Sequence, residues 1–179
     1  MSSVVISGNT SGAITLSAPD VSGTNTATLP AATGTVMVSG NMPAFSAYAG
    51  SSQSIANATF TKVQINTEEF DTANAFDSTT NYRFTPLVAG YYQVNGTVTM
   101  GSNPLSFQIS IYKNGSSFKK GLLTNTSASL QQTNVSALVY LNGSTDYIEL
   151  YVFQGSGVSV STVTSSDLTY FQAAMVRAS

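Results

Sequence analysis

The chain has 179 residues, enough for one domain with a substantial core and an additional segment. Only 8% of the residues are charged and the formal net charge is −2, so the sequence lacks the basic patch that nucleic-acid binding requires. It contains no Cys or His, which excludes disulfides, thiolate chemistry and the commonest general base and metal ligand. No apolar run approaches the roughly 20 residues of a membrane-spanning helix. We therefore expect neither nucleic acid nor a membrane as a partner.

Residues 1–42 differ from the rest of the chain, because Asp20 is their only charged residue. Short β-prone runs alternate with Gly, Pro, Asn and Ser, and no run has enough large apolar side chains to build a core. Strands of this kind become stable when they pair with another chain. The start lacks the charged and apolar regions of a signal peptide. We expect an anchor rather than a flexible tail, the alternative that is common at chain ends. Its anchoring side chains are predicted to be Val4, Ile6, Ile14, Leu16, Leu29, Val36 and Val38.

The second domain is predicted to span residues 43–179, and its clearest signal is the stretch 82–100. Pro86 and Gly90 predict a corner between a short strand and a longer one. Apolar and polar residues alternate after Gly90, which is the period of a half-buried strand. The face predicted to be buried carries Tyr92, Val94, Val98 and Met100.

Further strands with the same period of two follow along the domain. The predicted buried residues are Phe45, then Val63 and Ile65 in a strand over residues 61–71, then Leu105, Phe107, Ile109 and Ile111, and then Val135, Ala137, Val139 and Leu141. Asn114-Gly115 predicts a hairpin turn. Residues 71–81 are predicted to be a polar loop, and residues 117–134 read as either strand or loop.

The last two strands, residues 146–153 and 170–178, are apolar on both faces. A strand with water on one side would alternate more cleanly. The second face must therefore be covered by another layer of the chain or by another copy, and we find no 3.6-residue period that would supply a covering helix. Self-association is the better explanation.

The inventory of reactive side chains does not predict an enzyme. A nucleophilic Ser would need a base other than His, and the lysines fall in turns or at exposed positions. Glu68 and Glu69 are adjacent on a strand and point to opposite faces, so they cannot flank one substrate. Asp71 and Asp77 could ligate Ca²⁺ with loop carbonyls, but solvated loop acids are the better explanation. We expect no catalytic residue, no metal and no cofactor.

Four motifs in order carry a resemblance to a known family: RFTPLVAGYYQV from Arg83, ISIYKNG from Ile109, ALVYLNGSTDYIELYV from Ala137 and YFQAAMVRA from Tyr170. Together they resemble the jelly-roll heads of complement component one-q and the tumour necrosis factors. The resemblance implies an all-β jelly-roll β-sandwich that forms a homotrimer, with aromatics packed about the three-fold axis. The residues then expected at the trimer interface are Tyr147, Tyr151, Phe153, Tyr170, Phe171 and Met175.

The first forty residues, with ITLSAPD and NTATLPAATGTV, are similar to segments of tailed-bacteriophage virion proteins. The combined resemblance implies a non-enzymatic structural protein on the virion surface, assembled in the host cytoplasm. We expect a capsid decoration (cement) protein whose residues 1–42 dock on the major capsid protein or another virion protein. The alternative is the receptor-binding tip of a short tail fibre, with loops 71–81 and 121–134 recognising a host glycan. A secreted signalling-type trimer is a more remote alternative.

Overall fold

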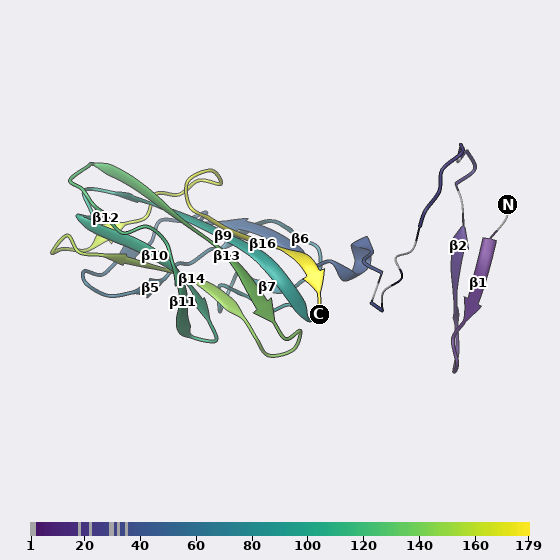
Figure 1. Cartoon of the computed structure of the whole chain (residues 1–179). Coiled ribbons are helices and arrows are strands. Elements are labelled where there is room, and N and C mark those ends of the chain that lie inside the picture. The colour runs from purple at the N-terminus through teal and green to yellow at the C-terminus, as the bar shows by residue number, and fades with distance from the viewer. Residues whose placement is uncertain (1–2, 18, 22, 29–30, 32, 35) are drawn as a thin grey trace. The chain divides into compact units, whose positions relative to one another are not determined.

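The structure is a computed structural model that describes residues 3–17, 19–21, 23–28, 31, 33–34 and 36–179. It divides into two compact units, residues 1–34 and residues 35–179 (Figure 1). The sequence places this division between residues 42 and 43. It falls earlier because Met37 already packs against the core of the second unit.

The first unit contains an antiparallel hairpin of β1 (Ser3–Ser7) and β2 (Ala13–Ser17). Gly12 has a φ of +76°, and the backbone N–H of Gly8 donates to its carbonyl at 2.9 Å, which closes the turn. Val4 pairs with Leu16 and Ile6 pairs with Ile14, so these four aliphatic side chains share one face. The two most apolar runs of the segment therefore pair with each other within one chain.

One further prediction for this segment is wrong, and another falls outside the described residues. The alternation of Val36 and Val38 predicts a strand, but both residues lie outside any strand and are exposed. Instead the chain turns through a short 3₁₀ helix, η1 (Ser39–Asn41), in which the Asn41 side chain accepts a hydrogen bond from the Val38 N–H at 2.8 Å. Leu29, which is also predicted to anchor the segment, lies outside the residues that the structure describes.

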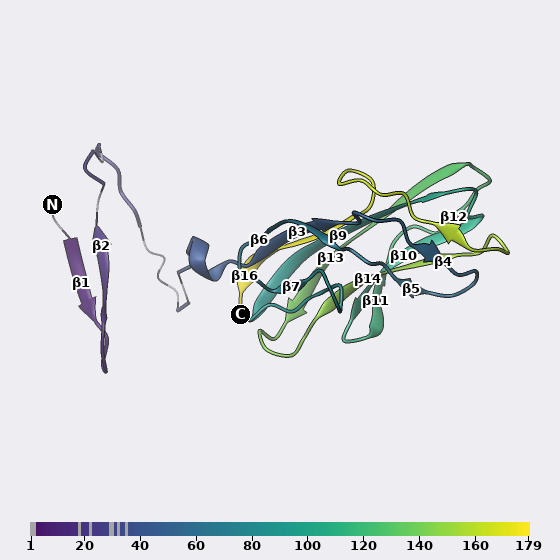
Figure 2. The ribbon, with the colours of Figure 1, turned by 180° about the vertical axis from the view of Figure 1, so that it is seen from behind.

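The second unit is a sandwich of two antiparallel sheets (Figures 1 and 2). The five-stranded sheet has the order β13 (Leu130–Leu141), β9 (Gly90–Gly101), β16 (Tyr170–Ala178), β3 (Ala44–Tyr48) and β6 (Thr67–Asp71). The seven-stranded sheet runs β11 (Ser116–Lys120), β10 (Ser106–Lys113), β14 (Ile148–Gln154), β8 (Arg83–Phe84) and β7 (Phe76–Asp77), with β12 (Thr124–Asn125) on β10 and β5 (Thr61–Lys62) on β14. A separate pair joins β4 (Ser54–Ile55) to β15 (Val160–Ser161).

The core lies between the two sheets, and Phe45 is at the centre of its aromatic part. Its ring stacks on Phe76 and Phe84 at centroid distances of 4.5 and 4.6 Å and meets the edge of Phe171 at 5.4 Å. Tyr92 is also fully buried, and its hydroxyl donates to the Val88 carbonyl at 2.7 Å, which ties the Pro-Gly corner to the long strand. The predicted inward faces of β9 and β13 are confirmed, with Ala137 only partly buried.

Two predicted strands are shorter than the sequence suggests. Val63 and Ile65 are buried as predicted, but they lie between β5 and β6, where the chain crosses from one sheet to the other. Leu105 is exposed because it precedes β10 with a φ of +53°. The Asn114-Gly115 turn is confirmed, since both residues have positive φ between β10 and β11.

Candidate interaction surfaces

The apolar face of the N-terminal hairpin is the first candidate surface. Val4, Ile6, Ile14 and Leu16 are between 55% and 68% exposed. No charged residue occurs among residues 3–17, so neither charge repulsion nor an ion pair acts on this face. A two-stranded hairpin alone is at best marginally stable in water. Four of the predicted anchoring residues thus meet on this one exposed face, which makes it a candidate contact surface.

The residues predicted to form the trimer interface do not share a surface. Phe171 and Met175 are 0% and 4% exposed and belong to the core between the sheets, so their side chains cannot meet another copy. Tyr170 is on the opposite face of the same strand and is half-buried. The prediction for Phe171 and Met175 is wrong because a strand pattern shows two apolar faces without showing which one meets the second sheet.

Tyr147, Tyr151 and Phe153 lie on the outer side of the seven-stranded sheet, where the chain itself covers them. Tyr151 stacks on Tyr112 with ring centroids 3.8 Å apart, and Phe153 packs against Phe60 at 5.3 Å. All of these rings are half-buried. The second apolar face of β14 is thus covered by side chains of β10 and of the segment before β5, so it gives no reason to require another copy.

A buried ion pair lies within this aromatic cluster. Glu149 is 3% exposed, and its carboxylate is 2.5 Å from the Lys62 ammonium group. Lys62 also donates to the Asn81 carbonyl at 3.1 Å. The Arg83 guanidinium stacks on the Tyr147 ring at 4.3 Å. These contacts hold β5 and the loop before β8 against β14, which is a structural role.

The outer face of the five-stranded sheet, the open face, remains exposed in the single chain. Large side chains at its end near the C-terminus are exposed: Tyr91, Leu138, Tyr140 and Val176. Tyr91 and Tyr140 are a cross-strand pair with ring centroids 5.4 Å apart. The strands predicted from the sequence do not include this cluster, although Leu138 and Tyr140 interrupt the polar face of β13 and are its signal in the sequence.

Farther along the open face most side chains are polar and bonded to one another, although Phe70, opposite Ser46, is 51% exposed. Ser136 accepts a hydrogen bond from the Gln93 side chain and donates one to Asn95, both at 2.8 Å. Ser46 donates to the Glu69 carboxylate at 2.7 Å. The polar side chains in this half of the face hydrogen-bond to one another. Another molecule can therefore cover them without leaving buried polar groups unpaired.

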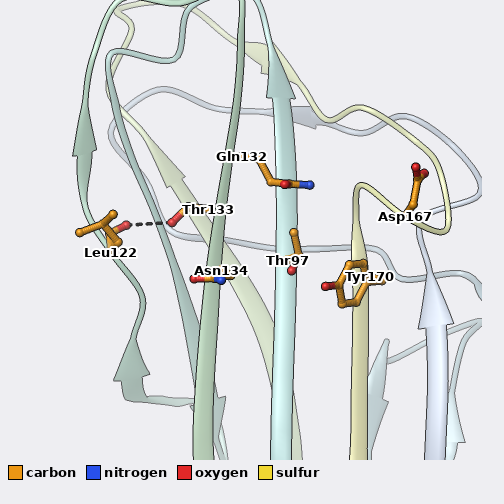
Figure 3. A pocket seen from close by; sticks show the side chains of 7 residues that line it. All are labelled: Thr97, Leu122, Gln132, Thr133, Asn134, Asp167 and Tyr170. Carbon is orange, nitrogen blue, oxygen red and sulfur yellow. Dashed lines mark hydrogen bonds between the residues drawn. The ribbon is translucent and has the colours of Figure 1, made fainter.

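A hollow of about 240 Å³ lies beyond this polar row (Figure 3). Asn134, Thr97 and Tyr170 line it from three neighbouring strands and form one cross-strand row. Leu122, Gln132, Thr133 and Asp167 complete the lining. The predicted recognition loop 121–134 thus contributes to a polar hollow that contains one aromatic ring.

The second predicted loop, residues 71–81, folds around its own carboxylates. Asp71 accepts hydrogen bonds from the N–H groups of Ala75 and Phe76 at 2.6 and 2.7 Å. Asp77 accepts them from Thr80 and from the Asn81 side chain at 2.9 and 2.6 Å, and these bonds lower its pKa. Both carboxylates are thus occupied as loop caps. Among the described residues, no group of three or more His, Cys, Asp or Glu side chains could hold a metal ion.

The same loop borders another hollow, of about 400 Å³. It also forms a hydrogen bond to Glu68, one of the two adjacent glutamates weighed as a carboxylate pair. Glu68 accepts a hydrogen bond from Ser78 at 2.6 Å, whereas Glu69 accepts its bond from Ser46 on β3. The two carboxylates point to different partners and do not flank one cleft. The hollow is lined by Asn74, Ala75, Phe76, Asp77, Asn81, Arg83, Thr85 and Leu87.

Solved structures share the architecture of the sandwich at low sequence identity. Murine APRIL matches with a TM-score of 0.60 and 9% identity, over 75% of this chain and 99% of that one. The globular domain of zebrafish complement 1qA matches with a TM-score of 0.57 and 16% identity, over 76% and 99%. The sandwich is a jelly roll of the tumour-necrosis-factor and complement 1q type.

The same jelly roll occurs in the PRD1 vertex protein P5, which matches with a TM-score of 0.53 and 14% identity over 75% of this chain and 97% of that one. Identities this low establish the jelly-roll fold alone. Neither models of known protein families nor curated proteins give a match to the chain. Within the part of the chain that the structure describes, no helix is long and apolar enough to cross a membrane.

Proposed function

We propose that the protein is a non-enzymatic structural protein of a phage virion, exposed on the particle surface. The observation that carries the proposal is the N-terminal hairpin, whose exposed aliphatic face needs a partner. The open edges of β1 and β2 offer unpaired backbone groups to which a strand of a virion protein can add. The likeness of the jelly roll to a vertex protein supports a role in a particle shell.

The jelly roll is proposed to form a homotrimer through the open face of the five-stranded sheet. Leu138 and Val176 are each 54% exposed there, and Tyr91 and Tyr140 lie beside them. Exposed apolar and aromatic side chains that gather on a domain are typical of an interface, and Arg177, opposite Tyr91, is an exposed charged residue beside them. This surface replaces the interface that the sequence predicts at Tyr147, Tyr151 and Phe153.

Among virion proteins, a capsid decoration or cement protein is the preferred assignment. The hairpin unit would bind the shell and the jelly roll would project from it. The test is binding of purified protein to particles that lack it. Deleting residues 1–40 is expected to leave a soluble oligomer that no longer binds, whereas binding by the truncated chain would contradict the anchoring role.

A second candidate function, recognition of a host glycan at the tip of a tail fibre, is favoured by the two hollows. Each is lined by one of the predicted recognition loops, and the hollow in Figure 3 combines the Tyr170 ring with amide and hydroxyl groups. Saturable host-cell binding by the jelly roll that free sugar competes would support this candidate. Tyr170→Ala should then reduce the binding, and no binding to host cells would exclude it.

A further inference from the structure

A row of three polar side chains on the open face has no hydrogen bond of its own. Thr97 on β9 lies between Asn134 on β13 and Tyr170 on β16, and all three line the hollow in Figure 3. Among the described residues, the hydroxyls of Thr97 and Tyr170 and the Asn134 amide have no hydrogen-bond partner. Thr97 is only 6% exposed. Polar groups this buried are normally paired, so the row needs a partner in the hollow.

The polar rows on either side of this one pair internally. On one side, the Ser136 hydroxyl forms hydrogen bonds of 2.8 Å to two neighbouring side chains. On the other side, the Gln132 amide donates to the Thr99 hydroxyl at 3.0 Å, and that hydroxyl donates to the Leu168 carbonyl at 2.8 Å. The sheet therefore pairs its polar side chains before and after the hollow and leaves them unpaired within it.

We propose that the hollow binds one ring of a neutral sugar, whose hydroxyls are the partners of the unpaired row. Thr97 and Asn134 hydrogen-bond to the sugar, and the Tyr170 ring packs against it. The inference rests on the second candidate function, recognition of a host glycan, and names the class of sugar that this site takes.

The lining of the hollow has the chemistry of a sugar site. Hydroxyl and amide groups both donate and accept hydrogen bonds, as the hydroxyls of a sugar do. The Tyr170 ring offers an apolar surface to the C–H groups of the sugar beside those polar groups. The volume of about 240 Å³ is below the roughly 300–1,000 Å³ of pockets for drug-sized ligands, so the hollow suits one ring.

The charge of the lining disfavours acidic sugars. Among the described residues that line the hollow, Asp167 alone is charged, and it is exposed. Its carboxylate accepts a hydrogen bond from the Ser165 hydroxyl and has lone pairs left for a sugar hydroxyl. A carboxylate on the sugar would instead meet a like charge, with no cation in the lining to pair with it. The site therefore selects uncharged sugars.

Saturation-transfer NMR on the full-length chain tests the class of sugar. The probes are the methyl glycosides of glucose, galactose, mannose and N-acetylglucosamine, with glucuronate and galacturonate as acidic counterparts. We expect a neutral glycoside to bind, and the hexuronates to bind about fivefold more weakly or less. Saturation transfer to no neutral glycoside, or equal binding of the hexuronates, would overturn the inference.

Substitutions in the two hollows test the position of the site. Thr97→Val removes the buried hydroxyl, keeps the shape of the side chain and should weaken binding about threefold to tenfold. Thr85→Val is the matched control, because Thr85 lines the other hollow, and it should leave binding unchanged. Both variants should keep cooperative melting curves. A loss of binding with Thr85→Val and none with Thr97→Val would overturn the assignment to this hollow.

Asp167→Asn tests the selection against acidic sugars. It removes the charge and keeps an acceptor oxygen, so the hexuronates should then bind within about twofold of the neutral glycosides. An unchanged preference would contradict the role of the carboxylate.

Host-cell binding separates this inference from glycan recognition itself. Binding that polygalacturonate competes and that Thr97→Val leaves unchanged would keep glycan recognition and overturn this site. A neutral glycoside that binds in the hollow without any host-cell binding would support the site and exclude the role as a tail-fibre tip.

Discussion

Gly143 lies in the turn that carries the chain from β13 into β14. It has a φ of +70°, and a Cβ at this position would be 2.3 Å from the Ala89 backbone nitrogen. The backbone cannot yield as a flexible side chain would, so both conformation and space require glycine. We expect Gly143→Ala to lower the free energy of unfolding by about 2 kcal/mol or more.

Denaturant titration of Gly143→Ala and of a control variant, Gly101→Ala, measures this effect. Gly101→Ala is the matched control, because its φ is not positive and its nearest contact would be 3.8 Å away. It should change the free energy of unfolding by less than about 0.5 kcal/mol. Equal losses in the two variants would contradict the role assigned to Gly143.

Asp77 gives the chain an acid-sensitive loop. The hydrogen bond from the Thr80 N–H is the largest cause of its lowered pKa, and the Asn81 side chain adds to it. A carboxyl whose pKa is lower in the folded state stabilises the fold above its unfolded pKa of about 3.9, and this stabilisation is lost as pH falls further. We expect Asp77→Asn to flatten the decline of Tm below pH about 4.

Thermal unfolding from neutral to acid pH tests this prediction. Asp146 also has a lowered pKa, chiefly through its hydrogen bond from Lys113. The double variant with Asp146→Asn should therefore flatten the curve further. An Asp77→Asn curve parallel to that of the unchanged chain would contradict the prediction.

The seven-stranded sheet depends on the Lys62–Glu149 pair for the attachment of β5. In the described part of the chain, Lys62 is the only group paired with the Glu149 carboxylate. Lys62→Met would leave that carboxylate buried without a partner, so we expect a loss of about 2 kcal/mol. The double variant with Glu149→Leu should recover much of it, because it removes the stranded charge.

Lys113→Met is the control for this pair. Asp146 is 2.9 Å from Lys113, and it also accepts a hydrogen bond from the Asn114 side chain. Because Asp146 retains that partner, the loss should stay near or below about 1 kcal/mol. Chemical unfolding of the four proteins measures the losses, and a double variant less stable than Lys62→Met would refute the stranded-charge explanation.

The same sheets show which elements a sequence can predict. Alternation located β9, β10 and β13, because one face of each meets the core and the period follows from that contact. It failed for β14, where Phe60 and Tyr112 cover the outer face from segments distant in the sequence. Alternation also predicts a continuous strand through Val63 and Ile65, which is wrong. The chain crosses there from one sheet to the other, so both side chains are buried although neither residue is in a strand.

The surfaces are harder to predict than the strands. The aliphatic residues of β1 and β2 were identified as anchoring residues, but their pairing in one hairpin depends on the tight turn at Gly12. Phe171 and Met175 have the composition of an interface, yet only the packing of the two sheets decides which face of β16 is inside. The open face is recognised by the exposure of its side chains in the folded chain. The alternation of residues in the sequence does not show which sheet face stays uncovered.

Leu138 provides the test of how the whole molecule assembles, because it is 54% exposed on the edge strand of the open face, next to Tyr140 and opposite Gln93. If copies meet there, Leu138→Asp places a carboxylate in a dry contact without a partner, at a cost of several kcal/mol. We expect light scattering to show a smaller particle for this variant than for the unchanged chain. Leu87→Asp is the control, because Leu87 is 75% exposed in the corner before β9, where it lines the hollow at the loop of residues 71–81. Its mass should be unchanged, and the melting curves of both jelly rolls should stay cooperative. Loss of assembly in both variants would point to a general effect of added charge, and retention in both would place the contact between copies elsewhere.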